Sequence, residues 1–276
     1  MRSLPLLIAA QALLFTAAMA ARTGDARSAD SLPNRDELQC QDSIAREARE
    51  FTKEKFELLV DCNNQVLWGY TCDVAKRDRQ IARLMDALTR AIKRSCSDIT
   101  LEHLGFPGGC LDTNGLSFSV DDLVSCVLNV VATRIDMAIM VEYPNLRPLR
   151  NRKEERCQSE IGDAGKTFFR RKLRARLHCL IQQLRGDIPA SVDCRAEFPR
   201  SVRGDEHVDG GNIGEAIRRA TQQLYNRLQR ACNHIALEPL GFPGLCPDAA
   251  LGAKAAGSAR LLFVGADARM PDVWAG

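Results

Sequence analysis

The pattern of apolar and polar residues along this chain is helical almost throughout. In the stretch that follows Cys40, one helical face is mostly apolar: Ile44, Ala48, Phe51, Lys55, Leu58, Leu59 and Cys62. Charged residues cover most of the rest: Glu47, Arg49, Glu50, Lys53, Glu54 and Glu57. This period indicates an amphipathic helix, and no stretch of the chain sustains the alternation of a β-strand. The sequence therefore predicts an all-α fold.

Two further helices are predicted before residue 147. The first carries apolar residues at near-heptad spacing, which suits packing on the preceding helix: Val74, Ile81, Leu84, Met85, Leu88, Ala91 and Ile92. Gly69, between the two, suits the left-handed position that ends a helix. The other helix begins at a capping box of Ser119 with Asp122 and stops at Pro144. Arg134 and Asp136 within it favour a buried helix over a membrane span.

The chain contains this arrangement twice. RSCSDITLEHLGFPGGCLD at 94–112 and RACNHIALEPLGFPGLCPD at 230–248 are identical at 12 of 19 positions. Upstream, Cys40 to Cys62 matches Cys157 to Cys179, each pair with 21 residues between the cysteines. The second copy repeats the apolar stripes over both of its helices but has no counterpart of the third. Two matched blocks in the same order indicate a tandem duplication. We interpret the shared LGFPG turn as a structural corner, with Phe106 anchored in the core.

These elements divide the chain into five parts. We expect a signal peptide at 1–20, a flexible segment at 21–36, repeat unit 1 at 37–147, repeat unit 2 at 148–248, and a poorly ordered Ala/Gly-rich tail at 249–276. Arg2, an apolar stretch to Ala18 and the small residues of Ala18-Met19-Ala20 are typical of a cleavable export signal. The chain is therefore predicted to be secreted or periplasmic.

Export changes the interpretation of the eleven cysteines, because an oxidising compartment favours a disulfide framework. In an antiparallel hairpin, the end of the first helix lies beside the start of the second, and the outer ends meet. This geometry predicts Cys40–Cys96 and Cys62–Cys72 in unit 1, and Cys157–Cys232 and Cys179–Cys194 in unit 2. The two cysteines that remain in unit 1 give the fifth pair, Cys110–Cys126. Cys246 is left over as a free thiol or an intermolecular link, because the helix that would carry its partner is missing from unit 2.

Metal, cofactor and catalytic sites find little support in the sequence. The chain has no C-x-x-C pair, no H-E-x-x-H and no G-x-S-x-G motif, and its four histidines are scattered. A calcium loop suggested by Asp205, His207 and Asp209 lacks the glutamate required at its last position, which is Ala216. We therefore expect no metal, no cofactor and no enzymatic activity.

Positive charge is concentrated at 147–185, a stretch that contains 12 Lys and Arg residues and 4 Asp and Glu residues. Its densest part lies on a predicted helix at 166–185: Arg170, Arg171, Lys172, Arg174 and Arg176. A solvated helix face is one interpretation. The other is contact with an anionic surface, either lipid headgroups or a polyanionic polysaccharide. Nucleic acid does not suit an exported chain with 5% aromatic residues.

Several motifs together resemble a group of uncharacterised exported bacterial proteins with cysteine-rich helical repeats. The resemblance rests on Cys40, Cys62, Cys72 and Cys96, on the corner from Leu104 to Cys110, and on Asp122-Leu123-Val124-Ser125-Cys126. It implies the architecture and no particular activity. We expect a non-enzymatic interaction or structural module whose partner is a protein or envelope component. The alternative is a lipid or anionic-surface binder that uses the basic helix, and a secreted hydrolase is a distant third.

Overall fold

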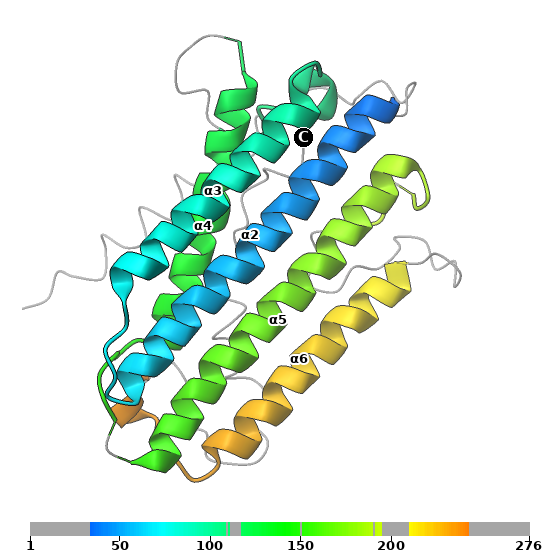
Figure 1. Cartoon of the computed structure of the whole chain (residues 1–276). Coiled ribbons are helices and arrows are strands. Elements are labelled where there is room, and N and C mark those ends of the chain that lie inside the picture. The colour runs from blue at the N-terminus through cyan, green and yellow to red at the C-terminus, as the bar shows by residue number, and fades with distance from the viewer. Residues whose placement is uncertain are drawn as a thin grey trace, which may run out of the picture. The chain divides into compact units, whose positions relative to one another are not determined.

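The computed structural model describes residues 34–108, 110, 117–149, 151–189, 191–194 and 210–242. Within these ranges it contains five α-helices and two short 3-10 helices, and no strand (Figure 1). The elements are α2 (Arg35–Leu67), α3 (Val74–Cys96), η1 (Leu101–Leu104), α4 (Val120–Glu142), α5 (Arg152–Arg185), α6 (Gly210–Cys232) and η2 (Glu238–Leu240). The all-α prediction is confirmed. The predicted signal peptide, Cys246 and the tail lie outside the described residues.

Helix α2 begins earlier than the sequence analysis predicts. The Asn34 side chain accepts hydrogen bonds from the N–H groups of Asp36 and Glu37, at 3.0 and 2.9 Å. The Glu37 carboxylate in turn accepts the Asn34 N–H at 2.8 Å. This capping box satisfies N–H groups that otherwise lack a partner at a helix start. The predicted flexible segment at 21–36 is therefore wrong for Arg35 and Asp36, which are helical.

The two repeats form two antiparallel hairpins, α2 with α3 and α5 with α6 (Figure 1). Gly69 and Gly186 follow the first helix of each hairpin, both with φ of +78°. The N–H groups of Tyr70 and Asp187 then bond back to carbonyls within the preceding helix, at 2.8 and 2.9 Å. This is the geometry of a glycine C-terminal cap, as predicted for Gly69.

Five disulfides lie within these hairpins and the α4 connection. They join Cys40 to Cys96, Cys62 to Cys72, Cys110 to Cys126, Cys157 to Cys232, and Cys179 to Cys194. These are the five pairs predicted from the sequence. Such a density of disulfides fits an extracellular or otherwise oxidising environment.

The two repeats share a hydrophobic core. Helix α2 packs against α5, and one cluster of buried residues includes Ile44 and Phe56 from the first repeat with Ile161 and Leu240 from the second. The rings of Phe56 and Phe169 lie 5.6 Å apart across the interface between α2 and α5. A two-helix hairpin cannot bury its apolar face alone, so the repeats bury theirs against each other.

The first LGFPG corner, and residues 240–242 of the second, pack onto this core. Gly105 and Gly241 follow their 3-10 helices in the left-handed conformation, with φ of 81° and 88°. Phe106 and Phe242, the next residues, are both buried. The proposed anchoring role of Phe106 therefore agrees with its position, and Phe242 occupies the equivalent place in the second repeat.

Helix α4 lies against α2 and α3 and leaves its outer face uncovered. It is long and apolar enough to cross a membrane by length and composition, yet only 22% of its apolar window is buried. Polar residues recur along its exposed side at Ser125, Asn129 and Thr133. The expectation of a buried helix is therefore wrong for much of its surface, because α2 and α3 cover one side of it and α5 makes fewer contacts with it.

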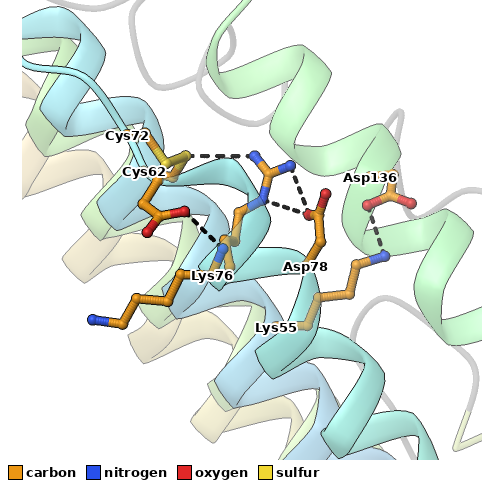
Figure 2. A network of polar contacts seen from close by, with 8 residues as sticks. Lys55, Cys62, Cys72, Lys76, Asp78 and Asp136 are labelled. Atoms are coloured by element: carbon orange, nitrogen blue, oxygen red, sulfur yellow. Dashed lines mark hydrogen bonds and ion pairs between the residues drawn. A yellow bond between two sulfur atoms is a disulfide. The ribbon is translucent and has the colours of Figure 1, made fainter.

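Two lysines are buried at equivalent positions of the two repeats. In the register that aligns Cys40 with Cys157, Lys55 aligns with Lys172, and both are almost fully buried. Lys55 extends from α2 to Asp136 on α4, as Figure 2 shows, with Nζ 2.7 Å from the carboxylate. Lys172 lies over the ring of Phe168, 5.6 Å from its centre. Each repeat thus places a cation inside the helical packing.

Candidate functional site

A groove lies between the first half of α2 and the second half of α5. It encloses about 650 Å³ and is lined by Asp42, Ala45, Arg46, Arg49, Arg171, Arg174, Ala175, Leu177, His178, Ile181, Ile213 and Ala216. The two helices run antiparallel, so early residues of α2 meet late residues of α5 (Figure 1). The helical period then brings four guanidinium groups to the groove, because residues three apart lie on one helix face.

Most arginines of the groove have no acidic partner for their positive charge among the described residues. Arg49, Arg171 and Arg174 make no ion pair or hydrogen bond with any residue that the structure describes. Arg46 pairs with its neighbour Glu47 at 3.0 Å, and its side chain remains 64% exposed. A guanidinium offers several N–H donors in a planar fork that matches carboxylate, sulfate and phosphate groups. The groove therefore offers donors for anionic groups on both of its sides.

Apolar side chains form the floor between these arginines. Leu177 of α5 and Ile213 of α6 are buried, and the methyl groups of Ala45 and Ala175 lie alongside them. Ligand sites commonly combine an apolar surface with a few convergent polar groups. The volume of the groove falls within the range of such sites, roughly 300–1,000 Å³.

A second, smaller cavity of about 360 Å³ adjoins the groove toward the start of α2. It is lined by Arg35, Leu38, Gln39, Asp42, Ser43, Arg46, Ser95 and Arg185. Asp42 and Arg46 line both cavities. Asp42 accepts a hydrogen bond from Arg185 at 2.6 Å, so the acidic group at the junction is already paired.

The basic run predicted from the sequence does not form one surface. Only Arg171 and Arg174 line the groove, whereas Arg170 and Arg176 do not. Lys172 is 5% exposed, so the prediction that it contacts an anionic surface is wrong. The physical reason is the helical period, which distributes consecutive residues around the axis and turns one of every three or four toward the core.

The arginines that α2 contributes to the groove were not predicted from the sequence. Arg49 belongs to the charged face of the predicted helix, and no pattern singles out Arg46. A signal was available in the repeat register, which aligns Arg171, Arg174 and His178 with Glu54, Glu57 and Asp61. The same helix face is therefore basic in one repeat and acidic in the other.

Because of this difference in charge between the repeats, acidic and basic residues gather at opposite ends of the α2–α5 interface. Because the helices are antiparallel, equivalent positions lie at opposite ends of their interface. Asp61 and Glu57 of α2 act electrostatically together with Asp163 and Lys166 of α5 at the end away from the groove. At this acidic end Glu142 is 1% exposed, and burial raises the pKa of its carboxyl group well above the ordinary value. The groove is thus the specifically basic end of the pair.

No group of His, Cys, Asp and Glu among the described residues is arranged to hold a metal ion. Comparison of the chain with protein families, with curated proteins and with solved structures finds no match.

Proposed function

We propose that this protein is an exported, non-enzymatic binding module whose ligand is anionic and occupies the groove between α2 and α5. The observation that carries the proposal is the convergence of Arg46, Arg49, Arg171 and Arg174 on an open groove with an apolar floor. The predicted signal peptide and the five disulfides support a location outside the cytoplasm, in the periplasm or the medium.

Electrostatics supports this choice over a purely structural role. Like charges brought together without counterions repel one another and reduce the stability of the folded state. Four arginines and one aspartate around a single groove therefore carry a cost that an anionic ligand would offset. A structural module has no need of that arrangement. The positions of the first repeat that are equivalent to Arg171 and Arg174 carry the opposite charge.

The proposal is tested by calorimetric titration with three anionic probes: inorganic pyrophosphate, a galacturonate disaccharide, and vesicles that contain anionic lipid. The decisive variant is Arg171→Gln with Arg174→Gln. Its matched control is Arg79→Gln with Arg83→Gln, which removes the same charge from exposed positions of α3. We expect at least one probe to bind the native protein, with affinity reduced about tenfold or more in the groove variant.

The control variant should lose much less affinity, because its arginines lie far from the groove and act only through screened long-range charge. Equal losses in the two variants would show non-specific attraction to a basic protein. That result, or a lack of binding by all three probes, contradicts the proposed function.

A further inference from the structure

The two cavities adjoin one another on the surface, and we call them together the channel. Asp42 and Arg46 line both cavities. Arg35 and Arg49, at its two ends on α2, are separated by about 21 Å along the helix axis at 1.5 Å per residue. A single phosphate or carboxylate would occupy only a small part of this length.

The lining of the channel combines three kinds of surface. Six arginines supply positive charge: Arg35, Arg46, Arg49, Arg171, Arg174 and Arg185. Gln39 and Ser95 supply neutral hydrogen-bonding groups in the smaller cavity, where Ser95 bonds to Ser43 at 3.0 Å. The floor of the larger cavity is apolar.

We propose that the channel binds an acidic oligosaccharide that lies across both cavities. This inference rests on the proposed function and specifies its ligand. Carboxylate or sulfate groups along the sugar chain pair with arginines on both sides. The C–H faces of the rings rest on Ala45, Ala175 and Ile181, and ring hydroxyls bond to Gln39 and Ser95. An inorganic polyphosphate has no apolar face or hydroxyl group, and a lipid carries its charge at one end only.

Substitution of Asp42 tests the proposal, because it should increase the affinity for the ligand rather than reduce it. Its carboxylate lies where the two cavities meet and faces any anion that crosses the junction, while it also occupies Arg185. Asp42→Asn removes the repulsion and releases Arg185 for the ligand. The affinity for a long acidic oligosaccharide should therefore rise in this variant, and it should rise more than the affinity for a short one.

The experiment measures the affinity of galacturonate disaccharide, tetrasaccharide and octasaccharide for the full exported chain at one ionic strength. We expect the octasaccharide to bind at least about tenfold more tightly than the disaccharide, because its two halves occupy linked sites. Arg35→Gln should remove most of that gain and should lower the affinity for the disaccharide much less. Asp42→Asn should increase the gain several-fold, and circular dichroism of each variant checks that it remains folded.

Other outcomes separate this inference from the proposed function. If the disaccharide binds in an Arg171-dependent and Arg174-dependent manner but longer chains gain nothing, the spanning mode is wrong and the anion-binding function stands. A polyphosphate of matched charge that equals the octasaccharide in affinity and in its sensitivity to Arg35→Gln contradicts the assignment to a sugar chain. Binding to anionic vesicles alone contradicts it as well.

Discussion

Lys55 on α2 and Asp136 on α4 form an ion pair in which only one partner is buried. Nζ lies 2.7 Å from the carboxylate, and the lysine side chain is 7% exposed whereas that of the aspartate is 54% exposed (Figure 2). The ammonium group also donates to the Ala132 carbonyl at 3.1 Å. The pair joins α4, the third helix of unit 1, to α2, the first. Because Lys55 is buried and Asp136 is exposed to water, loss of one partner should affect stability differently from loss of the other.

Loss of Asp136 should therefore destabilise the protein more than loss of the Lys55 charge. Asp136→Ala leaves a buried cation with the Ala132 carbonyl in place of a counterion, and we expect a cost of about 3 kcal/mol. Lys55→Met keeps the packing of the side chain and leaves an aspartate that water can solvate, so about 1 kcal/mol or less is expected. Urea unfolding of both variants, with Lys76→Met at an exposed position as a control, measures the difference. Equal costs, or the reverse order, would show that the buried lysine does not depend on Asp136.

Glu142 should make the stability depend on pH. Burial, followed by the nearby Asp163 carboxylate, raises the pKa of its carboxyl group, and Lys166 opposes this shift. Neither carboxyl oxygen has a hydrogen-bond partner among the described residues. Below the ordinary glutamate pKa, both the folded and unfolded states are protonated there. As pH rises, Glu142 ionises first in the unfolded chain, because its pKa is lower there than in the folded protein. The contribution of Glu142 to the free energy of unfolding therefore falls between the ordinary glutamate pKa and the raised pKa of the folded state.

Glu142→Gln removes this titration while it keeps the size of the side chain. The variant should match the native protein near pH 4 and become progressively more stable than it as pH rises toward 8. The free energy of unfolding, measured at several pH values, gives the comparison, and Glu102→Gln at an exposed position serves as a control. A stability difference that stays constant with pH would mean that Glu142 ionises normally in the folded protein.

Gly162 on α5 is expected to tolerate no larger residue. A Cβ atom at this position would overlap the hydroxyl and ring of Tyr143, whose hydroxyl donates to Asn64 on α2 at 3.0 Å. Gly162→Ala should cost about 1–3 kcal/mol through overpacking, despite the better helix propensity of alanine. In a Tyr143→Ala background the same substitution should cost much less, because the clash is gone. Thermal unfolding of the native protein, the two single variants and the double variant completes this double-mutant cycle. If the stability losses of the two substitutions simply add, the two residues are not in contact.

The disulfides of unit 1 should contribute unequally. Cys40–Cys96 spans 56 residues and Cys62–Cys72 spans 10. In the chain-entropy description, closing these loops restricts the unfolded chain and stabilises the folded protein by about 4 and about 3 kcal/mol respectively. Paired Cys→Ala variants of each disulfide should therefore differ by roughly 1 to 1.5 kcal/mol in unfolding free energy. Non-reducing peptide mapping first establishes the pairing, and a Cys40–Cys62 peptide would contradict it.

The local sequence was sufficient for the helices and for their connections. The stripe from Ile44 to Cys62, the Ser119–Asp122 capping box and Gly69 depend on residues within a few positions of one another. The disulfide pairs also followed, because an antiparallel hairpin leaves few choices for cysteines near its ends. Asn34 carried the same kind of local signal, since Glu37 stands three residues after it. The early start of α2 was thus available from the sequence.

Only the tertiary structure decided how the two hairpins meet. Which face of α2 packs on α5 depends on how the side chains of both helices fit together, and no local pattern specifies that fit. The antiparallel contact brings Arg46 and Arg49 to Arg171 and Arg174, and it turns Lys172 inward. The sequence by itself determined two disulfide-linked helical repeats with a basic segment. The packing of one repeat against the other turned part of that segment into a groove.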